Sequence, residues 1–224
     1  MSIADRLAVV RARIAAAAEG AGRSPADVKL VAVSKTKPAE AIREAYAAGQ
    51  RAFGENYAQE LAAKAADLAD LPGIEWHFIG HVQSNKAKVV ARFAHMVHAI
   101  DSVAIARELG KRASGRPLPL PSLVEVNVSG EAQKAGVSPA QLEDVGRAIR
   151  AEPALVLRGL MTVPPAGNPD AARAAFVALA RLRDLHGGAA IWPELSMGMS
   201  GDIEAAIALG ATYVRVGTAI FGER

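Results

Sequence analysis

The chain has 224 residues, of which 51% are hydrophobic and 4% aromatic, so residues 1–224 can form one domain with a core of small aliphatic side chains. A net charge of +3 without a basic run argues against nucleic-acid binding, and the absence of cysteine excludes disulfides and thiolate metal sites. Charged residues interrupt the N-terminal segment, and no apolar run reaches the roughly 18 residues of a membrane span. We therefore expect a soluble cytoplasmic protein.

Short β-rich runs alternate with helical segments along the whole chain. A helix is predicted first, at residues 3–20. Strands are then predicted at 29–34, 51–54, 74–80, 96–100, 123–128, 156–162, 194–197 and 212–217. The intervening helices are predicted at 39–48, 56–69, 84–93, 102–113, 139–150, 169–185 and 202–209.

Strands that alternate with helices of this length predict βαβ units and a parallel sheet. Eight strands favour an α/β fold that consists of a single (β/α)8 TIM-type barrel. The chain should end just after strand eight with no C-terminal helix, and the helix at 3–20 should complete the outer ring. An open doubly wound sheet is the alternative if the weakest strands, 51–54 and 194–197, do not form.

Lysine residues follow the first predicted strand, at the end where barrel enzymes place their sites. Val31, Val33 and Lys35 share one face because side chains alternate along a strand, so Lys35 should project into the barrel mouth. A lysine there suits Schiff-base chemistry if enclosure or a nearby cation, such as Lys37 or Arg215, favours its neutral form. Solvated loop lysines are the ordinary alternative for both.

The last two predicted strands end in loops that suit a phosphate. The loop after strand seven covers 196–202, and strand eight ends in 215–218; these are the loops that frequently bind phosphate in barrels. Ordinary turn glycines and a serine cap would explain either loop alone. The groups offered to an anion are backbone amides and hydroxyls at Gly198, Gly201, Gly217, Ser200 and Thr218.

Arg215 is the third candidate site residue. Its alternation along the strand places it with Tyr213 and Gly217, on the face opposite Val214 and Val216. A buried arginine needs an acceptor. That acceptor could be a ligand nitrogen or a carboxylate, such as those of Asp202 or Glu223.

Seven segments, taken in order over nearly the whole chain, closely resemble the pyridoxal phosphate homeostasis protein family, which is related to the N-terminal barrel of alanine racemase. The segments are VAVSKTKP (31–38), FGENY (53–57), WHFIGHVQSNK (76–86), LVEVNVSGEAQKAGV (123–137), RGLMTV (158–163), LSMGMSGD (195–202) and VRVGTAIFG (214–222).

This resemblance implies that pyridoxal 5′-phosphate (PLP) is the cofactor and that Lys35, rather than Lys37, forms the Schiff base. It implies phosphate contacts for Ser200, Gly217 and Thr218, a place opposite the pyridine nitrogen for Arg215, and a pocket lined by Asn56 and Met199. An arginine there leaves the ring a weaker electron sink than an acid would. We interpret His77, His81 and Gln83 as solvated or core-capping residues.

Three functions compete. The first is PLP homeostasis, in which the chain binds, shields or delivers the cofactor with little or no catalysis, possibly to apo PLP-dependent enzymes. The second is a PLP-dependent amino-acid racemase, which resembles this chain only in its first domain and takes a catalytic tyrosine from a second one. The third is a barrel for another phosphorylated metabolite. Because the chain stops at Arg224, and Tyr46, Tyr57 and Tyr213 are its only tyrosines, we expect the first function and a monomer.

Overall fold

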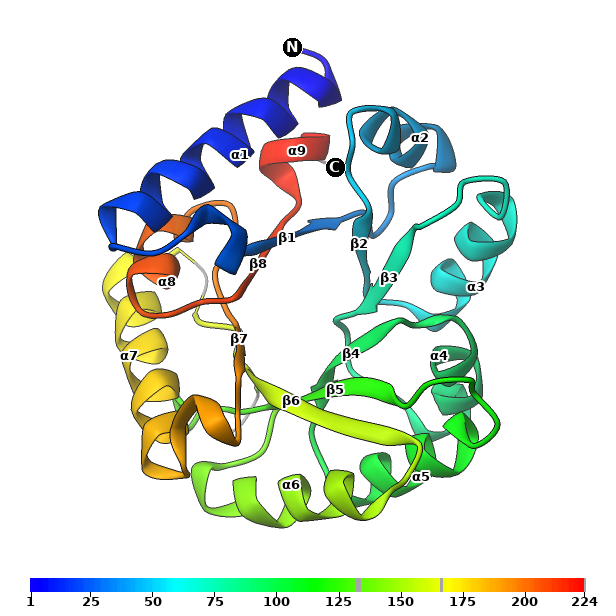
Figure 1. The fold of residues 1–224 in the computed structure, drawn as a ribbon, viewed down its shortest axis with the longest axis vertical. Coiled ribbons are helices and arrows are strands. Elements are labelled where there is room, and N and C mark those ends of the chain that lie inside the picture. Colours follow the sequence, from blue (N-terminus) through cyan, green and yellow to red (C-terminus); the bar gives the residue numbers. More distant parts are fainter. Residues whose placement is uncertain (132–133, 166, 224) are drawn as a thin grey trace.

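The strands of this computed structural model close into a parallel barrel in chain order, and β8 returns to pair with β1 (Figure 1). The structure describes residues 1–131, 134–165 and 167–223. The predicted (β/α)8 barrel is therefore confirmed, and the open sheet is wrong. The strands are β1 (Lys29–Val33), β2 (Ala52–Glu55), β3 (Glu75–Phe78), β4 (Met96–Ile100), β5 (Leu120–Glu125), β6 (Leu155–Met161), β7 (Glu194–Ser196) and β8 (Tyr213–Val216).

Helices surround the barrel (Figure 1). They are α1 (Ile3–Gly20), α2 (Ala39–Ala47), α3 (Ala58–Asp67), α4 (Ala87–Phe93), α5 (Val103–Ala113), α6 (Leu142–Ala151), α7 (Pro169–Leu185), α8 (Ile203–Ala208) and α9 (Thr218–Phe221). Short 3-10 turns occur at Pro25–Asp27, Ser84–Lys86, Pro139–Gln141 and Gly188–Ala190. None of the helices in the described ranges combines the length and the apolar character that crossing a membrane requires.

The N-terminal helix α1 fills the gap in the outer ring between α8 and α2, as predicted (Figure 1). Ser2 and Asp5 form a capping box at its start. Leu7, Val10 and Ile14 form a buried stripe at helical spacing that faces the barrel. The helix is thus an integral wall of the barrel.

Apolar side chains form two layers. Inside the barrel lies a small cluster that contains Val31, Leu123 and Tyr213, whereas a much larger shell between strands and helices contains Val214 and Val216. Alternation along β8 therefore directs its odd-numbered residues inward, as the sequence indicated. This orientation decides which side chains reach the barrel mouth.

Two sequence predictions at the element ends are wrong. The fifth strand begins at Leu120, three residues before its predicted start at 123. Pro121 is the second residue of the strand, where the lost amide donor removes one ladder bond without breaking the pairing with Val156. In addition, α9 follows β8 where no helix was expected. Residues 132, 133 and 224, which belong to segments used above, lie outside the described residues.

If α1 is a wall of the barrel, Leu7→Ala should destabilise the protein by about 2–5 kcal/mol, because it deletes a fully buried side chain. Val9→Ala on the exposed side of the same helix is the matched control and should change the free energy of unfolding by less than about 0.5 kcal/mol. Urea unfolding measures both. Equal effects of the two substitutions would contradict this placement of α1.

Candidate functional site at the barrel mouth

The loops after β7 and β8 meet at the carboxyl end of the barrel, as the sequence predicted. Thr218 Oγ1 lies 3.1 Å from Ser200 Oγ, and the amide of Ala219 donates to the same oxygen at 3.4 Å. The amide of Arg215 donates to the Gly198 carbonyl at 2.9 Å, which joins the two loops below this point. Two hydroxyls and the amide of Ala219 therefore converge on one small region.

Lys35 lies in the turn directly after β1, beside these loops. Val31 pairs in register with Arg215, and a Cβ built on Gly217 would lie 3.4 Å from Val33 Cβ. Lys35 follows β1 by two residues, in the turn at the carboxyl end of the strand, and this residue is half-buried. The structure thus brings Lys35 to the same mouth as Ser200 and Thr218.

Lys37 has a different environment. Its Nζ donates to the carbonyls of Gly222 and Glu223 at 3.1 and 2.9 Å. Lys37 therefore links the segment after α9 to the turn after β1, which is a structural contact.

A buried ionic cluster holds the residues on both sides of Lys35. Lys64 of α3 donates to the Ser34 carbonyl and to Glu55 at 2.7 Å each, and Ser34 Oγ donates to the same carboxylate at 2.6 Å. Glu60 accepts from Lys64 at 3.0 Å and from the amide of Thr36 at 2.8 Å. Thr36 has a φ of 62°, a left-handed conformation that is strained for a β-branched residue. The cluster stabilises this turn and so fixes the backbone of Lys35.

Arg215 lies beneath the two loops, with only 4% of its surface exposed. Its guanidinium donates to Ser196 Oγ at 2.7 Å and to the Thr162 carbonyl at 2.9 Å, and within the described residues it makes no ion pair. Asp202 instead accepts from the amide of Met199. Burial lowers the pKa of Arg215 to about 10, partly offset by the charges of Glu125 and Asp202. A buried cation held only by neutral acceptors favours a further acceptor from a ligand.

A chain of polar side chains continues from Arg215 down the barrel interior. Ser196 Oγ lies 2.8 Å from His98 Nδ1, and His98 Nε2 lies 2.9 Å from His77 Nδ1. Burial holds the pKa of His98 well below its usual range, so its ring is neutral. Because an arginine only donates, Ser196 accepts from it and donates to His98, whose remaining proton then points to His77. His77 is thus a core residue, as interpreted from the sequence.

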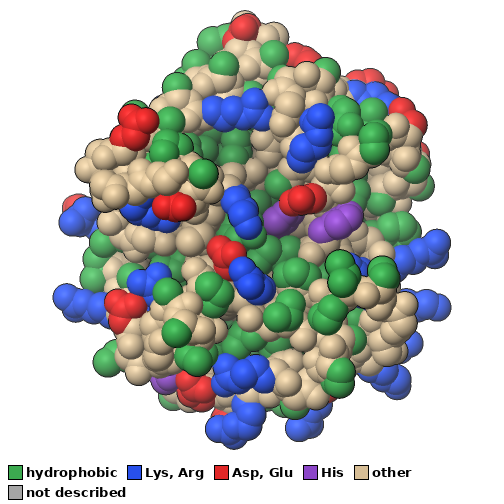
Figure 2. Space-filling view, viewed as in Figure 1, with side chains coloured by type: hydrophobic (Ala, Val, Ile, Leu, Met, Phe, Trp, Pro, Cys, Tyr) green, Lys and Arg blue, Asp and Glu red, His purple; other side chains and the backbone are tan. Residues whose placement is uncertain are grey.

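The opposite end of the barrel carries a second group of charged side chains (Figure 2). They border a cavity of about 400 Å³ lined by residues that include Lys29, Glu75, Arg158, Glu194 and Tyr213. These side chains are paired among themselves: Arg158 with Glu194 at 3.0 Å, and Lys29 with the Tyr213 hydroxyl at 3.2 Å. We interpret this group as a closure of the barrel floor.

Asn56 and Met199 lie at the same end as Lys35 but in separate cavities. Asn56 lines a space of about 260 Å³ together with His81 and Gln83, whereas Met199 lines one of about 280 Å³ beside the start of α7. His81 is exposed and paired with Asp101 at 2.7 Å. The structure therefore places both residues near the mouth without joining them to Ser200 and Thr218.

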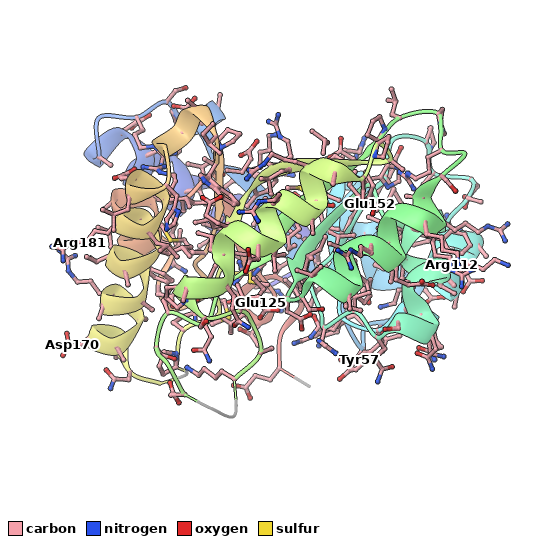
Figure 3. The ribbon with its side chains drawn as sticks, turned by 90° about the horizontal axis from the view of Figure 1, so that it is seen from below. Tyr57, Arg112, Glu125, Glu152, Asp170 and Arg181 are labelled. Atoms are coloured by element: carbon pink, nitrogen blue, oxygen red, sulfur yellow. The ribbon has the colours of Figure 1, made fainter. Side chains whose placement is uncertain are left out.

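Sequence reasoning did not single out Glu125, a buried acid at the same end of the barrel. It ends β5, and alternation with inward-facing Leu123 directs its side chain into the barrel; Figure 3 labels its position. Only 6% of its surface is exposed. Burial, together with the charge of Asp101, raises its pKa to about 7, against the opposing charges of Arg215 and His81. An acid inside the apolar run Leu123–Val128 was the available signal.

The alanine racemase N-terminal domain family matches residues 6–224 of this chain. A pyridoxal phosphate homeostasis protein of Pseudomonas aeruginosa is 53% identical over 100% of this chain and 96% of its own length. One from Escherichia coli K12 is 46% identical, with coverage of 99% and 97%. The chain belongs to the pyridoxal phosphate homeostasis protein family. The resemblance seen in the sequence is thereby confirmed.

Solved structures of other proteins share the fold. PipY of Synechococcus elongatus, determined with PLP bound, aligns with a TM-score of 0.82 at 39% identity over 99% of this chain and all of that chain. An alanine racemase of Corynebacterium glutamicum is 22% identical with a TM-score of 0.68, and this chain covers 61% of it. The racemase likeness shows the shared barrel alone.

Removing the cation of the buried cluster should be costly. Lys64→Met leaves Glu55 buried without its partner, so we expect a loss of about 3–5 kcal/mol in the free energy of unfolding. Adding Glu55→Gln to that variant should restore part of the loss. Lys88→Met, at an exposed position of α4, is the control and should be nearly neutral. A nearly neutral Lys64→Met, measured by urea unfolding, would show that the cluster does not stabilise the turn.

Glu125 should make stability depend on pH. Between its unfolded pKa of 4.5 and its folded pKa of about 7, the folded state holds the proton that the unfolded state has lost, so stability falls as pH rises. We expect Glu125→Gln to gain about 2.5 kcal/mol relative to the unmodified protein between pH 5 and 8, because each unit of pKa shift corresponds to about 1.4 kcal/mol. Parallel pH profiles of unfolding for the two proteins would refute the raised pKa.

Proposed function

We propose that this chain is a PLP-binding homeostasis protein that holds the cofactor at the carboxyl end of one barrel domain, through Lys35, and releases it with little or no turnover. The observation that supports this most strongly is the convergence of Lys35 with the Ser200–Thr218 hydroxyl pair above Arg215, which is buried and makes no ion pair with any described residue. Relatives of 46–53% identity carry the homeostasis name, and PipY has been determined with PLP bound.

The donor set at the mouth fits PLP chemically. Ser200 and Thr218 would bind the phosphate with their hydroxyls, and the glycine backbone at Gly217 leaves room for its close approach. Arg215 would donate to the pyridine nitrogen, because its bonds to neutral partners leave other guanidinium N–H groups available. We propose Asn56 and Met199 as residues at the edge of the pocket. PLP supplies an aldehyde for reversible condensation with amines and an electron-withdrawing ring.

The residues of this chain suit retention of the cofactor better than turnover. Ser196 and the Thr162 carbonyl hold the Arg215 guanidinium as a donor, so the group facing the ring nitrogen does not deliver a proton as a carboxylic acid would. The buried cluster around Glu55 and Lys64 fixes the Lys35 turn. Both features keep the lysine and the ring-nitrogen donor in a fixed arrangement.

Racemisation is the alternative, and the tyrosines argue against it. Racemisation needs acid and base groups on two faces of the reacting carbon. Tyr46 donates to the Pro72 carbonyl on the outside of the barrel, Tyr57 is 54% exposed, and Tyr213 begins β8 at the opposite end from Lys35. No tyrosine of the described chain is therefore placed as a buried base at the mouth.

The proposal extends to the recipients of the cofactor. A half-buried Lys35 in an open loop region suits exchange with other proteins, and we propose apo PLP-dependent enzymes as recipients and a monomer as the working state. Another phosphorylated metabolite in place of PLP is the remaining alternative. The absorption spectrum of the protein mixed with PLP decides between the two.

Purified protein mixed with PLP should develop a yellow absorption band, because a lysine imine extends the conjugation of the ring. Borohydride should fix the cofactor on Lys35, as peptide mass mapping will show. Lys35→Ala should lose the band while retaining part of the affinity through the phosphate loops. Lys37→Ala is the matched control and should keep the band. An adduct on Lys37 would move the attachment site, and a colourless protein without adduct would refute PLP binding.

A further inference from the structure

Glu125 has no role in the proposed cofactor site, yet its environment is unusual. Only 6% of the surface of this residue is exposed, and it ends a strand with its side chain directed into the barrel. In the described part of the chain, no side chain or amide makes a hydrogen bond or an ion pair with that carboxyl group. Neither carboxyl oxygen of Glu125 is among the fully enclosed side-chain atoms that lack a hydrogen-bond partner in the described residues, so this carboxyl group stays reachable from the barrel mouth and can accept a hydrogen bond from a ligand.

The groups around Glu125 indicate the chemistry of that partner. Asp101, directly after β4, adds a second negative charge near the carboxyl, while Arg215 on β8 and His81 after β3 contribute positive charge. His81 is already engaged with Asp101 at 2.7 Å, and Arg215 with Ser196 and Thr162. Glu125 is therefore the group here that can still accept a hydrogen bond from a ligand, and the negative charge of Asp101 favours a positively charged donor.

The location of Glu125 narrows the ligand further. It ends β5 and faces the interior, while Lys35 follows the end of β1; both thus lie at the carboxyl end of the same barrel. When a lysine has condensed with an aldehyde, another primary amine can displace it from the aldehyde carbon. Such amines reach the site as ammonium ions and react only after losing a proton. A buried acceptor across the mouth suits this requirement.

We propose that Glu125, supported by Asp101, forms a subsite for the ammonium group of a small primary amine and takes up its proton. The proton passes from the ammonium nitrogen to a Glu125 carboxylate oxygen, which leaves a neutral amine and a neutral carboxylic acid. This subsite exists whether or not PLP is bound. Its value for cofactor exchange rests on the proposed function of Lys35.

The test follows the carboxyl carbon itself. The protein, labelled with ¹³C at glutamate carboxyl groups, is titrated with acid and base in the NMR spectrometer, without PLP, and the Glu125 resonance is identified by its loss in Glu125→Gln. We expect the titration midpoint of Glu125 to lie near pH 7. In saturating ethylamine hydrochloride it should fall by about one pH unit, because a bound ammonium ion favours the carboxylate over the carboxylic acid about tenfold. Sodium chloride at equal ionic strength should leave the midpoint unchanged. If Glu125→Gln does not fold, Glu125→Asp removes the same resonance.

A second measurement uses the protein loaded with PLP. The decay of the lysine-linked absorption band after addition of ethylamine should slow about tenfold in Glu125→Gln and stay unchanged in Glu40→Gln, an exposed residue of α2. A Glu125 midpoint near 4.5, or one that ethylamine does not move, overturns the subsite. Equal decay rates in Glu125→Gln and the unmodified protein overturn its role in exchange. Absence of any band in the unmodified protein instead counts against the proposed function and leaves the NMR result standing.

Discussion

The pairing of β8 with β1 is the constraint on which the site depends. Residues at opposite ends of the chain have no local reason to meet, yet the register sets Val31 against Arg215. That pairing carries Lys35 to the loops that hold Ser200 and Thr218. Because α1 covers the β8–β1 seam through its contacts with α2, α8 and α9, the helix that precedes the first strand is as necessary to the site as the strands are.

Buried charge is distributed unevenly around this seam. Outside the barrel, Lys64 compensates Glu55, and Ser34 and Thr36 share their polar groups with the same cluster, so its burial rigidifies one turn. Inside the barrel, Arg215 meets only neutral acceptors, and Glu125 meets no partner among the described residues. The two sets of buried charge differ in counter-charge: Lys64 pairs with Glu55, although Glu55 Oε2 keeps no hydrogen-bond partner of its own among the described residues. The cluster outside the barrel thus supports the fold, whereas Arg215 and Glu125 inside the barrel are available to a ligand.

Much of this architecture could be predicted from local patterns. Alternation of strands and helices indicated the barrel, parity along β8 placed Arg215 inward, and the helix at 3–20 was found with its observed bounds. The start of β5 was missed because Pro121 argues locally against a strand, and pairing with β6 overrides that preference. α9 was missed because four residues after a strand carry too little periodicity. The roles of Lys35, Asn56, Met199, Ser200, Arg215, Gly217 and Thr218 toward PLP stay predictions.

The contacts that sequence reasoning could not supply are those between side chains far apart in the chain. Nothing near Glu55 indicates that Lys64 will neutralise it, and nothing near Glu125 indicates that no residue will. Both acids end barrel strands, yet Glu55 on β2 points outward to a helix and Glu125 on β5 points inward to the mouth. Side chains alternate between the two faces of a strand, so the face on which each acid falls decides its role. The outward-facing acid stabilises the fold, and the inward-facing acid is available to a ligand.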